Sequence, residues 1–177
     1  MPDGDSTLAD IPRPGHRGVS RVASRIFIGL LLLACVAGAV GLLGGHTSVA
    51  VSTRNGYRVQ LSYPGTARPG LDTFWELEIT HPGGFKGQLT IAVTGAYFDL
   101  FETQGFYPTP SATTRDGSFV YMTFTAPSQG DTFKVMYDAY VQPYLEPNHL
   151  LGQTATVAVM NHGQAADSIH YTTWLLP

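Results

Sequence analysis

The chain has 177 residues, a formal net charge of −3 at pH 7 and a single cysteine. One cysteine cannot form an intrachain disulfide, so a folded domain here must be held together by its core alone. The first 25 residues balance four arginines against three aspartates, which excludes the strongly basic arm typical of nucleic-acid binding.

Residues 1–25 are rich in Asp, Pro, Gly and Arg and show no apolar periodicity. A segment of this composition buries too little apolar surface to offset its conformational entropy. We therefore expect residues 1–25 to form a disordered cytoplasmic tail whose arginines face anionic lipid headgroups.

Residues 26–45 form an uncharged run of 20 residues. As an α-helix rising about 1.5 Å per residue, this run matches the roughly 30 Å hydrocarbon core of a bilayer. The first basic residue after it is Arg54, whereas four arginines closely precede it: Arg13, Arg17, Arg21 and Arg25. This asymmetry predicts a single-pass helix in the cell membrane, with a cytoplasmic N-terminus and an extracytoplasmic C-terminal part.

Two alternatives to a retained helix stay open. A signal peptide has an apolar core of about 7–15 residues, shorter than this run, but cleavage near Gly45 or His46 would still export the rest. Leu32-Leu33-Ala34-Cys35 also resembles a lipoprotein cleavage site, which would make Cys35 a lipid-modified N-terminus. The apolar residues that follow Cys35 favour the retained helix.

Small residues recur in the run at spacings of four, three and four, at Ala34, Gly38, Gly41 and Gly45. In a helix they would lie along one face and let another membrane helix approach closely. The pattern predicts packing against an integral membrane protein or self-association through the helix. The alternative is that Gly and Ala are simply common in membrane helices.

Residues 46–177 have the size of a single exported domain and carry six Lys or Arg against ten Asp or Glu. Apolar residues alternate with polar ones through most of this part, and Pro or Gly clusters separate the runs. Asn55-Gly56 between two alternating runs predicts a β-hairpin. Strands are expected around Val49–Val51, Tyr57–Tyr63, Trp75–Ile79, Leu89–Val93, Val120–Phe124, Phe133–Val141, Thr154–Met160 and Ile169–Leu176. Seven to eight short strands predict a mainly β fold, an antiparallel immunoglobulin-like β-sandwich preceded by one transmembrane α-helix.

Several turn and strand motifs carry a family resemblance. They are Tyr63-Pro64, Arg68-Pro69-Gly70, Trp75-x-Leu77-x-Ile79, Pro82-Gly83-Gly84-Phe85, Tyr97-Phe98-Asp99, and residues 137–143 and 173–177. The chain thereby resembles small bacterial single-pass membrane proteins of uncharacterised function. Its strand order is also similar to that of repeat-type immunoglobulin-like modules of bacterial surface proteins. Because genes of this family often lie beside one for a YetF-like multi-span membrane protein, the resemblance implies such a partner, and it carries no catalytic residue across.

Chemistry-bearing residues do not form a catalytic or metal motif in the sequence. The histidines lack ligand spacings, although a fold could bring His81, His149 and His162 together. Asp99 and Glu102 could serve as paired carboxylates in glycoside hydrolysis. Aspartates in turns, such as Asp116 before Gly117, usually accept hydrogen bonds from backbone amides instead. We expect no enzyme, no cofactor and no metal.

Two aromatic segments, residues 97–108 and 141–151, are interpreted as loops between strands. Large apolar side chains in loops either cover the core or meet a partner. For the second case the candidate contact residues are Phe101, Phe106, Tyr107, Tyr144 and Leu145. The outward positions of Met136, Tyr140 and Trp174 add apolar surface.

The sequence therefore predicts a non-enzymatic, membrane-anchored accessory or interaction protein. It would bind a membrane-protein partner through its helix and aromatic loops, contact membrane lipid, and bind no nucleic acid. The alternative is an extracytoplasmic ligand- or metal-binding surface module.

Overall fold

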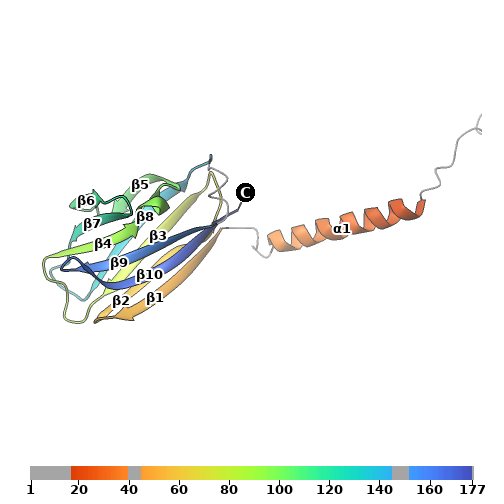
Figure 1. Cartoon of the computed structure of the whole chain (residues 1–177). Coiled ribbons are helices and arrows are strands. Elements are labelled where there is room, and N and C mark those ends of the chain that lie inside the picture. Colours follow the sequence, from red (N-terminus) through yellow and green to blue (C-terminus); the bar gives the residue numbers. More distant parts are fainter. Residues whose placement is uncertain (1–16, 40–44, 145–151, 177) are drawn as a thin grey trace, which may run out of the picture. The chain divides into compact units, whose positions relative to one another are not determined.

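The computed structural model describes residues 17–39, 45–144 and 152–176 (Figure 1). The chain divides into two compact units, residues 1–43 and 44–177.

The first unit contains one long helix, α1 (Arg17–Ala39). Its stretch Arg21–Ala39 is long and apolar enough to cross a membrane, although a signal sequence near the N-terminus has the same properties. The helix begins nine residues before the expected start at Ile26, so residues 17–25 are helical where a disordered tail was expected. Extending an existing helix costs far less than nucleating one, which accounts for the longer N-terminal end.

The second unit is built almost entirely from strands. They are β1 (His46–Arg54), β2 (Tyr57–Ala67), β3 (Asp72–Thr80), β4 (Gln88–Thr94), β5 (Phe101–Tyr107), β6 (Ala112–Arg115), β7 (Phe119–Thr125), β8 (Thr132–Val141), β9 (Gln153–Asn161) and β10 (Gln164–Leu175), with a short helix α2 (Gly95–Phe98) between β4 and β5. The expectation of a mainly β domain after one apolar helix is confirmed.

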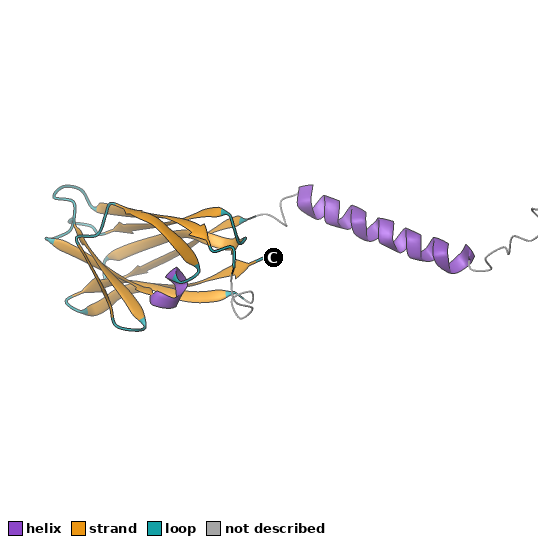
Figure 2. Cartoon of the chain, turned by 90° about the horizontal axis from the view of Figure 1, so that it is seen from above, coloured by secondary structure: helices purple, strands orange, loops and turns teal. Residues whose placement is uncertain are grey.

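The strands form a continuous path in the order β5-β8-β3-β2-β10-β9-β4-β7-β6, with β1 paired to β2. The path curls on itself (Figure 2), so that β1, β2, β3, β8 and β5 face the layer made by the other strands. Among the described residues, β2 and β10 form the one parallel pair, through Trp174 opposite Thr66 and Leu175 opposite Ala67. The fold is therefore sandwich-like, but the described residues form ten strands rather than seven to eight, and their pairing is mixed rather than purely antiparallel.

The hairpin predicted at Asn55-Gly56 is confirmed. Arg54 pairs with Tyr57 across a two-residue turn, and Asn55 and Gly56 have φ angles of 50° and 81°. Two successive residues with positive φ match the right-handed twist of the flanking strands. The turn fixes the register of β1 on β2, and through it the face that each side chain takes.

The core lies between the two layers and follows the predicted alternation. In β3 the inward residues Trp75, Leu77 and Ile79 are at most 1% exposed. The opposite layer contributes β4 and β9 side chains such as Ile91 and Val157, which are fully buried. Because the layers share this apolar interior, the outward faces of the same strands are left to polar residues and to any binding surface.

Residues 97–108 do not form the loop that the sequence predicted. They contain the end of α2 and the edge strand β5, which pairs with β8 through an irregularity between Thr103 and Gly105. The extra residue shifts the alternation, so that Phe101 and Phe106, five positions apart, both lie opposite inward residues of β8. The period-two signal of a strand is lost at this bulge.

The turn before β7 is held by Asp116. Its carboxylate accepts hydrogen bonds from the backbone N–H groups of Phe119 (2.8 Å) and Ser118 (3.1 Å) and from the Tyr121 hydroxyl (2.8 Å). These bonds, first that from Phe119 and then that from Tyr121, lower the pKa of Asp116 below its ordinary value of 3.8. The predicted role of this aspartate in turn formation is thus confirmed.

We expect Asp116→Asn to reduce the loss of stability in acid. The folded state lowers the pKa of Asp116. The carboxylate therefore stabilises the fold at pH values above its pKa in the unfolded chain, and this stabilisation is lost as the pH falls through its pKa in the folded protein. Urea unfolding of both proteins at about pH 7 and about pH 3 measures the difference. Asp131→Asn, which alters an exposed aspartate bonded to the Thr132 hydroxyl, is the matched control for charge removal. An equal effect of both substitutions would contradict the role assigned to Asp116.

Candidate interaction surface

The structure places the predicted aromatic contact residues in different environments. Phe101 is 5% exposed and belongs to the core, and the Phe106 ring stacks on that of Tyr137 with centroids 4.5 Å apart. Tyr107 and Tyr144, by contrast, are 63% and 92% exposed. Leu145 lies outside the described residues. The chain's own core therefore covers the two phenylalanines, and the two tyrosines remain open to solvent.

The register of the sheet brings Tyr107 together with other exposed apolar side chains. Tyr107 in β5 lies directly opposite Met136 in β8, and Met136 lies opposite Glu76 in β3. Phe74, two residues before Glu76 on the same face, is 43% exposed, and Met136 is 38% exposed. Directly opposed and diagonal neighbours on one face are within side-chain reach. Phe74, Met136 and Tyr107 are called the outer patch below.

The Tyr107 ring also lies over Gly105. A Cβ at Gly105 would lie 3.6 Å from the Tyr107 ring, which is an ordinary van der Waals distance. An aromatic residue over an edge glycine covers backbone that would otherwise face water. One side of the ring thus contacts the edge strand, and the rest of the side chain stays exposed.

Carboxylates surround the outer patch. Outward positions of β2, β3, β8 and β5 carry five acidic residues and two basic ones: Asp72, Glu76, Glu78, Glu102 and Asp138 against Arg58 and Lys134. Lys134 donates to Glu76 across 2.9 Å, and this bond raises the pKa of the Lys134 ammonium group. Half of the ten acidic residues of the domain thus lie on one face.

The expected small-residue face of the helix is only partly described. Ala34 and Gly38 lie on α1, and Gly41 lies outside the described residues. Gly45 belongs to the second unit, where a side chain at this position would lie 3.5 Å from the Thr66 carbonyl oxygen. That distance is an ordinary van der Waals contact, so the approach to β2 does not by itself require glycine here.

The histidines considered as metal ligands have other contacts. The His81 Nδ1 atom is 2.8 Å from the Gly84 carbonyl oxygen, and its ring lies 4.4 Å from that of Tyr57. His162 occupies the β9–β10 turn with a φ of 48°, and His149 lies outside the described residues. Within the described ranges, no three His, Cys, Asp or Glu side chains are placed to share a metal ion.

The carboxylates considered as a catalytic pair also have structural surroundings. Asp99 follows α2 and forms an ion pair with Arg115 at the end of β6, with Nη2 and Oδ2 3.2 Å apart. Glu102 lies on the outward face of β5, opposite Tyr140. The Asp99–Arg115 pair joins α2 to the outer edge of the second layer, which gives this aspartate a structural role.

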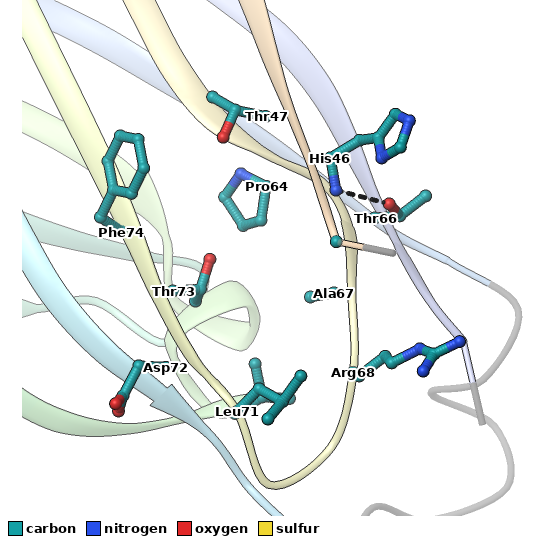
Figure 3. Close-up of a pocket in the computed structure, with 12 residues that line it drawn as sticks. His46, Thr47, Pro64, Thr66, Ala67, Arg68, Leu71, Asp72, Thr73 and Phe74 are labelled. Carbon is teal, nitrogen blue, oxygen red and sulfur yellow. Dashed lines mark hydrogen bonds between the residues drawn. The ribbon is translucent and has the colours of Figure 1, made fainter. Parts of the chain in front are cut away.

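A hollow of about 160 Å³ opens where the chain enters the domain. Figure 3 shows Pro64, Leu71 and Phe74 around it, with the Arg68 guanidinium directed away from its centre. A second, more open groove of about 580 Å³ runs between β1–β2 and β9–β10 and is lined by His46, Thr154, His170, Thr172 and Trp174, among others. Both depressions adjoin the end of the domain at which β1 begins.

Phe74 and Leu71 were not singled out from the sequence. A signal was present for Phe74, because Trp75 faces inward and strand alternation then directs Phe74 outward, beside Glu76 and Glu78. Leu71 carries no such signal, since it lies in the turn between β2 and β3. Which exposed residues lie together depends on register, and register becomes visible only in the folded sheet.

No family model matches the chain, and no curated protein matches it. Several solved structures resemble its strand arrangement. One is a chain of the complex between CaDoc0917 and CaCohA2, 10% identical, covering 74% of this chain and 100% of that chain with a TM-score of 0.41. A DUF4466 family protein from Parabacteroides merdae is 11% identical, and the match covers 68% of this chain and 44% of that chain with a TM-score of 0.38. A GH20 exo-β-N-acetylglucosaminidase from Vibrio harveyi is 12% identical, and the match covers 70% of this chain and 18% of that chain with a TM-score of 0.32. At these values the likeness extends no further than a β-rich fold.

Proposed function

We propose that this chain is a non-enzymatic, membrane-anchored interaction protein whose exported immunoglobulin-like sandwich binds an integral membrane protein. In this proposal α1 is retained as the anchor, with the N-terminus in the cytoplasm. The observation that carries the proposal is the outer patch, in which three large apolar side chains from β3, β8 and β5 share one exposed face. Aromatic residues and methionine on an exposed sheet face are typical of contact surfaces.

Charge indicates the chemistry of the partner. The face around the outer patch has an excess of three negative charges, from five carboxylates against two cations. Complementary charge steers association and disfavours wrong partners. The extracytoplasmic surface of the partner should therefore combine an apolar centre with lysine or arginine around it. The family resemblance predicts a multi-span membrane protein in this role.

Photo-crosslinking in native membranes tests the proposal. A photoreactive amino acid replaces Tyr107 in one variant and Thr114 in another, an exposed residue of β6 in the opposite layer. We expect a single adduct of discrete mass from position 107 and none from position 114. The same adduct from both positions, or none from position 107, would contradict the outer patch as the binding surface.

Substitutions then measure how much the outer patch and its surrounding charges contribute to partner binding. Phe74→Ser should weaken recovery of the adduct about tenfold, because buried aromatic anchors carry most of the binding energy of an interface. Glu78→Lys should weaken it less and in a salt-dependent manner, because a rim charge mainly affects association. Gly38→Leu on α1 separately tests the helix contribution. If Gly38→Leu left the adduct unchanged, the helix would act as an anchor alone.

A further inference from the structure

Exposed apolar side chains gather at the end of the sandwich where β1 begins, which we call the His46 end. Strands β2, β8 and β10 end there and β3 begins there (Figure 1). The hollow is lined jointly by His46, Ala67, Leu71 and Val141, and Leu175 of β10 pairs with Ala67. Leu71 in the β2–β3 turn is 54% exposed, Tyr144 after β8 is 92% exposed, and Trp174 near the end of β10 is 53% exposed.

These residue types are characteristic of a bilayer surface. Tryptophan and tyrosine combine an apolar ring with a polar group and are enriched at the headgroup level of membranes. Leucine supplies purely apolar area. Three such side chains from separate elements at one end of a domain leave apolar surface in water unless something covers it.

The Trp174 ring packs against backbone at Gly152. Trp174 pairs with Thr66 in the parallel contact between β10 and β2. On its other side the indole lies against Gly152, whose φ of +89° and close approach both exclude a side chain, since a Cβ there would come within 2.9 Å of the ring. The indole therefore lies against backbone on one side and beside the open groove on the other.

Arg68 gives the His46 end a cation for a phospholipid surface. Of the residues that line the hollow, Arg68 carries a positive and Asp72 a negative charge, and the Arg68 guanidinium is directed away from the centre of the hollow (Figure 3). Lipid phosphates are acceptors for guanidinium groups. Asp72 and Glu102 lie opposite Tyr140 near this end, whereas Glu76, Glu78 and Asp138 lie further along β3, β8 or both.

We propose that the His46 end docks on phospholipid of the extracytoplasmic leaflet, with Leu71, Tyr144 and Trp174 at the headgroup level. This inference rests on the proposed anchoring by α1. The chain enters the domain at His46, so an anchored chain holds this end at the bilayer at a high effective concentration. Docking leaves Met136 and Tyr107 of the outer patch on the side of the sandwich, available to a membrane-protein partner, whereas Phe74 also lines the hollow at the His46 end.

The chain's two tryptophans make the test direct. Trp75 is 1% exposed, in the core, whereas Trp174 is 53% exposed at the His46 end. The full chain is reconstituted into vesicles of phosphatidylcholine and phosphatidylglycerol, with or without brominated phosphatidylcholine, which quenches tryptophan at short range. We expect the brominated lipid to remove most of the Trp174 emission, leaving the Trp174→Phe variant nearly unaffected. The double change Leu71→Ser and Tyr144→Ser should reduce the quenching.

A matched control moves the probe along the same domain. In Trp174→Phe combined with Val51→Trp, the new indole lies at an exposed position of β1 away from the His46 end, and we expect acrylamide in the aqueous phase to quench it while the brominated lipid does not. Equal lipid quenching at both positions would overturn end-on docking. End-on docking would also be overturned if the chain floated with the vesicles but acrylamide alone quenched Trp174. The same conclusion would follow if neither quencher acted on Trp174 because a second copy covered it. A chain that does not float would overturn the membrane anchor and the docking together.

Discussion

Replacing Trp75 by alanine is expected to lower the free energy of unfolding by about 3–5 kcal/mol. Trp75 is 1% exposed in β3 and lies opposite Tyr137 of β8. Its removal would leave a large cavity where the two layers meet, and the surrounding side chains can collapse into it only in part. The Trp75 indole nitrogen has no well-formed hydrogen bond, so lost packing should account for nearly all of the effect.

The matched control is Trp174→Ala. This substitution removes the same side chain from an exposed position, where the expected change is within about 0.5 kcal/mol. The free energy of unfolding of both variants is measured by urea unfolding of the full chain in mild detergent. Near-ultraviolet circular dichroism of the tyrosines serves as the signal. If Trp174→Ala destabilised the domain as much as Trp75→Ala, Trp174 would belong to the core and could not serve as a docking residue.

We expect Asp167→Ala to cost about 1–3 kcal/mol, because it leaves the Ser52 hydroxyl and the Ser168 N–H without their acceptor in a nearly closed site. Asp167 is 2% exposed, and its Oδ1 atom accepts hydrogen bonds from the Ser52 hydroxyl (2.6 Å) and the Ser168 N–H (2.7 Å). Beside it, the Asn55 side-chain amide donates to the Ala166 carbonyl (2.7 Å). These bonds tie the β1–β2 hairpin to β10.

A double-mutant cycle with Ser52→Ala measures the bond between the two strands. The two substitutions should be strongly non-additive, since each removes the same hydrogen bond. Asp167→Asn should cost less than Asp167→Ala, because the amide oxygen can still accept from Ser168. Additive costs for the Ser52 and Asp167 substitutions would show that this bond does not join β1 to β10 in solution.

The sequence predicted those parts of the fold that depend on local pattern. The alternation around Trp75 and Phe133 identified β3 and β8, because both strands have one buried and one solvated face. Asn55-Gly56 identified a hairpin because its turn requires positive φ at both residues. Asp116 was interpreted correctly as a turn residue, since a short carboxylate next to glycine readily accepts backbone hydrogen bonds.

The features that the sequence did not predict depend on contacts between distant segments. The bulge in β5 shifts Phe106 relative to Phe101, so a reading with a period of two residues misses the strand. The parallel contact of Trp174 with Thr66 joins strands more than a hundred residues apart, and no local signal marks it. The outer patch likewise exists only because register sets Tyr107 opposite Met136. Candidate contact residues could be found singly, whereas the surface that they form could not.

The pairing of β1 with β2 also has a mechanical consequence. β1 is the strand through which the chain enters the domain, and it pairs with β2 along all of its nine residues. Hydrogen bonds of an antiparallel pair are perpendicular to the strands, so a pull directed along β1 loads them together in shear instead of opening them one at a time. A tether attached at His46 can therefore transmit force to the sandwich without peeling away its first strand.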